Sequence, residues 1–254
     1  MTQKLFISFL MFLAVPAQAQ TIDWSARTYA RTTLQGIYSD TQAARGLITY
    51  RANCSRCHQD SLFGGEQPLP LVQDRFLNRW REESLHPLLV AMKTMPKDRE
   101  EKLSESEYAD ILAYLMKANS FPAGDKDLKA SDLADIQLIT QAGTQPLPVS
   151  AGVQVVGCFT RTPNGAWQLT NATSFLRSRN LSESKPEELK AAIDAQLGSR
   201  TIPVENIEYL SRPDFKVESL SGHKVHLKGA LNRRNGVESI KVTWFESVSP
   251  SCSK

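Results

Sequence analysis

The sequence predicts two domains, an all-α domain followed by a small β-barrel-like domain that carries a helical insertion. Apolar residues recur with helical spacing up to about residue 118, and from residue 153 they alternate as in β-strands. Removal of the first 19 of the 254 residues would leave 235, a length that suits two modest domains. We therefore expect a helical domain over residues 20–124, a strap and linker over 125–150, and the β-barrel-like domain over 151–254.

The first 19 residues have the composition of a secretory signal peptide. Lys4 precedes an apolar run from Leu5 to Val15, and Ala17-Gln18-Ala19 then supplies a small-residue cleavage site. The run is too short for a membrane span, and no later stretch approaches the ~18 apolar residues that a span needs. Without Lys4 the formal charge falls from +3 to +2, which gives no basic field for nucleic acid or an anionic membrane. We expect an exported, soluble protein.

The first helix of the mature chain is expected to begin at Ser39 or Asp40, with Gln42 placed to return a capping bond. Gly46 and Tyr50 follow at an interval of four, so they share one stripe of this helix. A glycine in such a stripe lets a second helix approach closely. The stripe therefore predicts a helix crossing.

This helix runs into Cys54-Ser55-Arg56-Cys57-His58, a C-x-x-C-H run of the kind that attaches a c-type haem. Two thiols three positions apart can each bond one haem vinyl group, and His58 then reaches the iron as proximal ligand. A thioredoxin-like redox pair would follow a strand, whereas a helical pattern precedes this run. A zinc site would need a second ligand pair at comparable spacing, which the sequence lacks. We expect one covalent haem c.

Met95, between Thr94 and Pro96, is the candidate for the second axial ligand of the iron. A thioether is a soft ligand that favours Fe(II) and raises the haem potential. Met92 and His86 are alternatives, and an open or water-ligated iron is a third. Met92 lies in register with the apolar residues of its helix, which favours a place in the core. Two helices are expected before Met95, on apolar residues at helical spacing: Phe76, Leu77 and Trp80, then Leu85, Leu88, Leu89 and Met92.

Ser104 and Glu107 form a capping box that predicts the start of the clearest helix in the chain. Asn119 is expected to end this helix in a left-handed conformation. We expect the helix to cross the first one at Gly46 and Tyr50. Its apolar residues follow the i, i+3, i+4, i+7 pattern: Tyr108, Ile111, Leu112, Leu115 and Met116.

Residues 38 to 124 resemble a class I cytochrome c. The run Asp110–Lys117 is similar to that family's carboxy-terminal helix. Gly46, Tyr50 and Tyr114 match the small and aromatic positions where the family's terminal helices cross. The resemblance covers little more than a third of the mature chain and implies an all-α fold around one haem.

The resemblance also implies a role for each residue of the motif. Cys54 and Cys57 match the attachment positions, His58 the proximal ligand and Met95 the distal ligand. A haem with two protein ligands leaves no site for a substrate, so we expect an electron-transfer protein rather than an enzyme. A peroxidase-like haem enzyme, and a redox or gas sensor read out by the second domain, are the alternatives.

A narrower likeness concerns the segments beside the distal ligand and after the last helix. Thr94-Met95-Pro96 and Phe121-Pro122-Ala123-Gly124 are similar to cytochromes that accompany periplasmic quinoprotein dehydrogenases. The likeness implies a redox partner protein, with such a dehydrogenase as the candidate. Haem attachment at the C-x-x-C-H run, together with the signal peptide, points to the bacterial periplasm.

From Val153 onward the periodicity is that of strands. Five or so short strands and one helix predict a small barrel, which resembles the oligonucleotide/oligosaccharide-binding (OB) fold in architecture and implies no ligand by itself. The expected elements are strands at Val153–Phe159 and from Trp167, a turn at Pro163-Asn164-Gly165, a helix within Lys185–Leu197, and strands at His223–Leu231 and around Ile240–Trp244.

Cys158 and Cys252, near the two ends of this domain, are expected to form a disulfide in an oxidising compartment. His223 and His226 would face opposite sides of a strand, which predicts solvent-exposed residues rather than a metal pair. Four arginines are expected to be scattered, solvated charges, with a polar docking surface as the alternative: Arg177, Arg179, Arg233 and Arg234.

Overall fold

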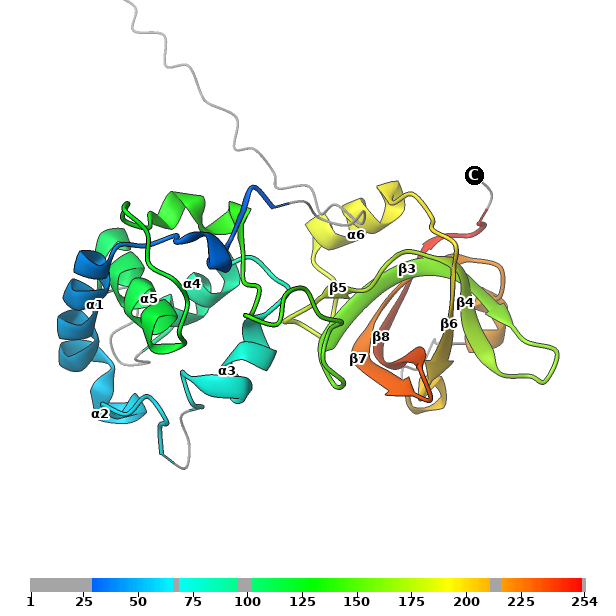
Figure 1. Cartoon of the computed structure of the whole chain (residues 1–254). Helices are drawn as coiled ribbons and strands as arrows, with labels where there is room; N and C mark the ends of the chain where they lie inside the picture. Colours follow the sequence, from blue (N-terminus) through cyan, green and yellow to red (C-terminus); the bar gives the residue numbers. More distant parts are fainter. Residues whose placement is uncertain (1–28, 66–68, 96–101, 211–215, 253–254) are drawn as a thin grey trace, which may run out of the picture.

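The computed structural model describes residues 29–65, 69–95, 102–210 and 216–252, and it contains a helical region followed by a β-rich region (Figure 1). The expected signal peptide and Pro96 lie outside the described residues. Within the described part of the chain, no helix has the length and the apolar character needed to cross a membrane.

The helical region contains five α-helices and two 3₁₀-helices among the described residues. A two-stranded parallel sheet, Arg31 with Ile136 and Thr32 with Gln137, joins its beginning to its end. The elements are β1 (Arg31–Thr32), η1 (Thr33–Gln35), α1 (Asp40–Asn53), α2 (Ser55–His58), α3 (Gln73–Trp80), α4 (His86–Lys93), α5 (Glu105–Ala118), η2 (Ala130–Asp135) and β2 (Ile136–Gln137).

The starts of α1 and α5 follow the local sequence signals. The hydroxyl of Ser39 accepts a hydrogen bond from the backbone N–H of Gln42 at 3.0 Å, and Ser104 and Glu107 form the expected reciprocal capping box. The end of α5 differs from the prediction. Asn119 has φ −94°, and the left-handed residue is Ser120 with φ 63°. The Asn119 side chain is instead used in tertiary hydrogen bonds, which are described below.

The predicted crossing of α1 and α5 at Gly46 is confirmed. A Cβ atom at Gly46 would lie only 1.8 Å from the carbonyl oxygen of Asp110 on α5, so the helix backbones touch at this point. One turn further along, the rings of Tyr50 and Tyr114 pack with their centroids 5.2 Å apart. The Tyr50 hydroxyl donates a hydrogen bond to the carbonyl of Gln59 at 2.7 Å, which fixes the chain just after α2. The crossing thus positions the C-x-x-C-H motif.

The segment after α5 lies along the helical region and closes its core. The Gln42 side chain forms two hydrogen bonds to the backbone of Leu128, at 2.8 and 2.6 Å. The apolar residues of the segment are buried with those of α1, α3, α4 and α5: Leu128, Leu133, Ile136 and Leu138. The helical region therefore includes this segment as part of its core.

The β-rich region is one six-stranded sheet in the order β4-β6-β8-β7-β3-β5. All neighbouring strands are antiparallel except β6 and β8, which are parallel. The elements are β3 (Gly152–Arg161), β4 (Trp167–Ala172), β5 (Leu176–Arg177), α6 (Pro186–Asp194), β6 (Arg200–Glu205), η3 (Ile207–Tyr209), η4 (Val217–Leu220), β7 (Lys224–Arg234) and β8 (Val237–Ser249).

The sheet is strongly bent (Figure 1), but it is not the closed barrel that was expected. Strand β3 has two partners along its length: it pairs with β7 along residues 152–158 and with β4 along its last residues, 158–161. The beginning of β3 pairs with the two residues of β5. The expected disulfide between Cys158 on β3 and Cys252 after β8 is present. It ties the segment after β8 to the first long strand.

The prediction of a solvent-exposed His226 was wrong. His226 and Lys228 are fully buried on the outer face of β7, where α6 and the preceding loop cover the sheet. The ring nitrogens of His226 lie 3.2 Å from the Ser184 hydroxyl and 3.0 Å from the Gln154 carboxamide oxygen, and burial lowers its pKa to about 4. Lys228 forms an ion pair with Glu188 of α6 at 2.7 Å. The polar residues at alternating positions of β7 therefore contact α6 and the loop before it instead of facing water.

Candidate functional site

The C-x-x-C-H motif lies at the junction of α1 and α2. Cys54 ends α1, and its backbone N–H donates to the carbonyl of Tyr50 at 2.7 Å. The backbone N–H groups of Cys57 and His58 both donate to the carbonyl of Cys54, at 3.2 and 3.0 Å. This tight turn brings both thiols and the imidazole together within five consecutive residues. Neither thiol forms a disulfide, and the Cys57 side chain is exposed whereas Cys54 is partly buried.

Burial sets the protonation of these groups. The pKa of the Cys54 thiol is raised to about 11, mainly by burial and secondly by the neighbouring Cys57. The pKa of His58 is lowered by burial, and a weaker opposing effect comes from the backbone of Leu69. His58 is therefore held as a neutral imidazole near neutral pH, and this is the form that ligates iron.

A buried imidazole nitrogen and exposed apolar side chains in the segments after the motif fit a flat, apolar cofactor with an iron centre. The Nδ1 atom of His58 is buried and has no hydrogen-bond partner among the described residues. Three large apolar side chains from the segments beyond the motif are about half exposed: Phe63 at 50%, Leu69 at 45% and Met95 at 52%. A porphyrin would cover such side chains and remove their apolar surface from water. The residues present thus fit a haem attached at Cys54 and Cys57.

Met95 lies two residues beyond the end of α4, where its backbone N–H donates to the carbonyl of Met92 at 3.1 Å. Met92 is partly buried and packs against the helical core, and Met116 is fully buried. Both are therefore used in packing, so Met95 is the methionine among the described residues whose side chain is most open to serve as a ligand. His86 is the first residue of α4, so roughly 10 Å of helix separates it from Lys93, at the end that precedes Met95.

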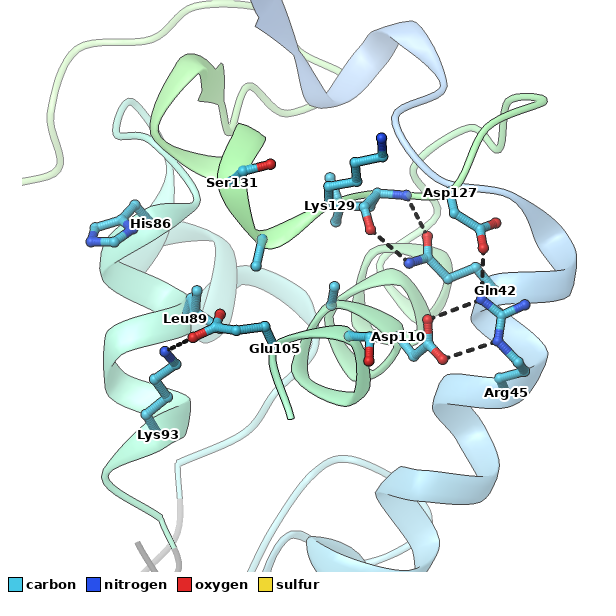
Figure 2. Close-up of a pocket in the computed structure, with 14 residues that line it drawn as sticks. Gln42, Arg45, His86, Leu89, Lys93, Glu105, Asp110, Asp127, Lys129 and Ser131 are labelled. Atoms are coloured by element: carbon cyan, nitrogen blue, oxygen red, sulfur yellow. Dashed lines mark hydrogen bonds and ion pairs between the residues drawn. The ribbon is translucent and has the colours of Figure 1, made fainter. Parts of the chain in front are cut away.

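A groove of about 800 Å³ lies away from the motif, between α1, α4, α5 and η2 (Figure 2). Arg45 bonds to Asp110 at 3.0 and 3.1 Å and to Asp127 at 2.7 Å, and Lys93 pairs with Glu105. The carboxylates that line the groove are thus already paired with cations. The lining residues are Gln42, Arg45, His86, Leu89, Lys93, Glu105, Ser106, Ala109, Asp110, Asp127, Leu128, Lys129, Ala130 and Ser131, so it contains His86 but none of the motif residues or Met95.

Sequence reasoning missed one residue that supports the site, Asn119. Its side chain amide donates to the carbonyl of Leu71 at 2.9 Å, and its carbonyl accepts from the N–H of Gln73 at 3.0 Å. These bonds tie the end of α5 to the end of the loop that follows the motif. Its place after a strong helix marks Asn119 as a helix terminus, but nothing in the pattern indicates these partners.

A comparison with protein families matches residues 41–115 to "Cytochrome C oxidase, cbb3-type, subunit III". A search among curated proteins and a search among solved structures found no match. The matched segment begins in α1, contains the C-x-x-C-H motif and Met95, and ends in α5. It supports the resemblance to class I cytochromes c, in which haem c is bound covalently. The helical region is thus a cytochrome c-type domain that carries haem c and is followed by a β-rich region outside the match.

Proposed function

We propose that this chain is a periplasmic c-type cytochrome that carries single electrons through one covalent haem with Met95 and His58 as axial ligands. The observation that carries the proposal is the position of the motif. Cys54, Cys57 and His58 follow directly on a helix that crosses α5 at Gly46, within a segment that matches a cytochrome c family. This position, directly after the main helix pair of the domain, supports the assignment of Cys54, Cys57 and His58 as the attachment residues and proximal ligand.

The bound haem supplies a one-electron Fe(III)/Fe(II) couple. The chain holds His58 neutral by burial and presents Met95 beyond α4, so both axial positions can be filled by protein ligands. A six-coordinate iron offers no position to a substrate. Cys57 is exposed, so the haem edge attached to it would lie near the surface, where a redox partner can approach. These features favour an electron carrier over an enzyme.

We also propose a redox partner protein, with a periplasmic quinoprotein dehydrogenase as the candidate. No observation favours the peroxidase-like or sensor alternatives, because His86 lies at the far end of α4 and lines the separate groove (Figure 2). We further propose domain limits near residues 124 and 151, with residues 125–150 as a strap and linker whose first part closes the helical core, and an OB-like architecture for the second domain. Its pairings β3–β4, β4–β6, β6–β8, β8–β7 and β7–β3 follow one another as in a partly open five-stranded barrel.

Substitution of either motif cysteine by alanine should sharply lower the yield of protein with covalent haem, because each thiol forms one thioether bond. Haem content after extraction with acidified organic solvent measures covalent attachment directly. The Cys158→Ala variant is a matched control, since it removes a cysteine from the β-rich region and should leave haem content per folded protein unchanged. Extraction of a full complement of haem from the unmodified protein would refute the proposal.

Replacement of Met95 by alanine should abolish the weak near-infrared band of sulfur-to-iron charge transfer in the oxidised protein. Because Met95 is 52% exposed, its replacement should disturb packing less than replacement of a fully buried methionine such as Met116. Met92→Leu is the control, because it keeps an apolar side chain of similar volume at the partly buried neighbour. If the band survives in Met95→Ala, Met95 is not the ligand.

A further inference from the structure

Two arginines of the β-rich region contact the carboxyl end of α3. Arg177 ends β5, and its Nη2 atom donates to the carbonyls of Asn78 and Arg81 at 3.3 and 3.2 Å. The Nη2 atom of Arg179 donates to the carbonyl of Arg79 at 2.8 Å. Figure 1 shows α3 on the side of the helical region that is nearer the sheet. Two of the four arginines that were expected to be solvated charges therefore form a contact between the regions.

These bonds supply what the end of α3 lacks. The chain becomes extended at Arg81, with ψ 158°, so no further helical turn provides N–H donors for the last carbonyls of the helix. Cationic donors at this end also complement the negative end of the helix dipole. Arg177 and Arg179 thus cap α3 from a different part of the chain. Such a cap holds the helix only while the β-rich region stays in place.

Side-chain contacts strengthen the same junction. The Arg179 guanidinium carbon lies 4.0 Å from the centroid of the Trp80 ring, which is within the range of a cation–π contact. Glu83 accepts a hydrogen bond from Arg179 at 2.5 Å, and its carboxylate lies 3.9 Å from Nε of Arg177. The side chains of Arg177 and Glu83 are only 7% and 15% exposed. The contact is thus largely withdrawn from solvent, and this burial lowers the pKa of Arg177 to about 10.

The amino end of α3 leads directly into the loop that follows His58. The N–H of Gln73 and the carbonyl of Leu71 are both bonded to Asn119. The N–H of Leu71 donates to the carbonyl of Leu62 at 2.8 Å, and the N–H of Gly64 donates to the carbonyl of His58 at 3.1 Å. A continuous set of backbone contacts therefore runs from the capped helix to the proximal ligand.

We propose that Arg177 and Arg179 are positioning residues for the haem, which act by fixing α3 and, through it, the described segments that follow the motif, residues 59–65 and 69–72. The β-rich region then helps to hold the haem environment in place and does not move as an independent domain. The inference rests on the proposed function. It adds a structural role for the second region that the motif residues do not supply.

The test uses the full-length holoprotein and the variants Arg179→Ala and Arg177→Ala. Amide hydrogen exchange in α3 and residues 59–65 and 69–72 should become at least about tenfold faster, because the carboxyl end of α3 loses its cap. The midpoint potential should fall, since a loosened loop admits water that stabilises Fe(III). Arg179→Lys should recover only part of both effects, because lysine keeps the charge but not the planar fork or the stacking.

The matched control is Arg161→Ala. Arg161 also stacks on a tryptophan, 5.2 Å from the centroid of Trp167, and donates to the carbonyl of Gly165, but it lies in the β3–β4 hairpin. The Arg161→Ala substitution should leave the midpoint potential and the hydrogen exchange in α3 unchanged. Glu83→Gln is a second variant that keeps the side-chain shape, so it tests the contact even if an alanine variant fails to fold. Glu83→Gln should also lower the midpoint potential, but by less than the arginine variants do.

Two results would overturn the inference. One is unchanged exchange in α3 in the arginine variants, which would show that they do not hold the helix. The other is faster exchange in α3 of the arginine variants while their midpoint potential stays equal to that of Arg161→Ala. This result would show that the helix does not position the haem. Failure of the proposed function itself is seen separately, as an unmodified protein without covalent haem or without reversible one-electron reduction.

Discussion

Replacement of Gly46 by alanine should destabilise the cytochrome region by at least about 3–4 kcal/mol, although the change adds one methyl group. The new Cβ would lie 1.8 Å from the carbonyl oxygen of Asp110 and 3.0 Å from Cβ of Tyr114. A backbone carbonyl inside a helix cannot rotate away, so α1 and α5 must separate. Such a separation would loosen the packing of the helix pair that positions the motif, and overpacking of a tight contact is costly. Against a total stability of about 5–15 kcal/mol for a domain, this is a large fraction.

Chemical denaturation followed by the haem absorption measures this effect, because the covalent haem stays on the unfolded chain. Gly65→Ala is the matched control. A Cβ at Gly65 would meet nothing nearer than the Gln59 side chain at 3.8 Å, so the free energy of unfolding should be nearly unchanged. Equal stabilities of the two variants would contradict the close helix crossing.

Removal of the disulfide by the double substitution Cys158→Ser and Cys252→Ser should lower the free energy of unfolding of the β-rich region by up to about 4–5 kcal/mol. The two cysteines are 94 residues apart, and a closed loop of this size restricts the unfolded chain strongly in the chain-entropy model. Strand β3 should become easier to unfold, because it is no longer tied to the segment after β8. The haem spectrum should not change, since the bond lies outside the cytochrome region.

Tryptophan fluorescence during denaturation, with and without a reductant, measures the loss of stability. Reductant should shift the midpoint of the unmodified protein towards that of the double variant and leave the double variant unchanged. Peptide mapping without reduction should recover Cys158 linked to Cys252. Alkylation of both thiols in freshly purified, unreduced protein would contradict the bond.

The parts of the fold that could be predicted are those with local causes. Capping residues at Ser39 and Ser104 are read from a few neighbouring positions, and each begins a helix in the structure. Gly46 was informative because glycine weakens a helix interior, so its presence there indicates a close contact with another element. The haem motif is similarly local, since its chemistry depends on five consecutive residues.

The errors arose where distant segments decide the environment. His226 alternates with apolar residues and was therefore expected to face solvent, but α6 folds over that face of β7. Arg177 resembles a surface charge until the end of α3 is placed against it. Asn119 was interpreted as a helix end alone, because its partners Leu71 and Gln73 lie 46 to 48 positions earlier. Periodicity describes a segment by itself and contains no information about what packs on it.

The pairing of β1 with β2 has a consequence for the order of events during synthesis. Thr33 both donates to and accepts from the backbone of Ile139, next to the Arg31–Ile136 pair, so the beginning of the cytochrome region cannot be closed before residue 139 exists. For an exported chain the same order holds at the membrane, because Cys54 and Cys57 precede Ile139 by more than 80 residues. Until Ile139 has followed, the two thiols belong to an open chain. Cofactor attachment can therefore precede closure of the cytochrome region.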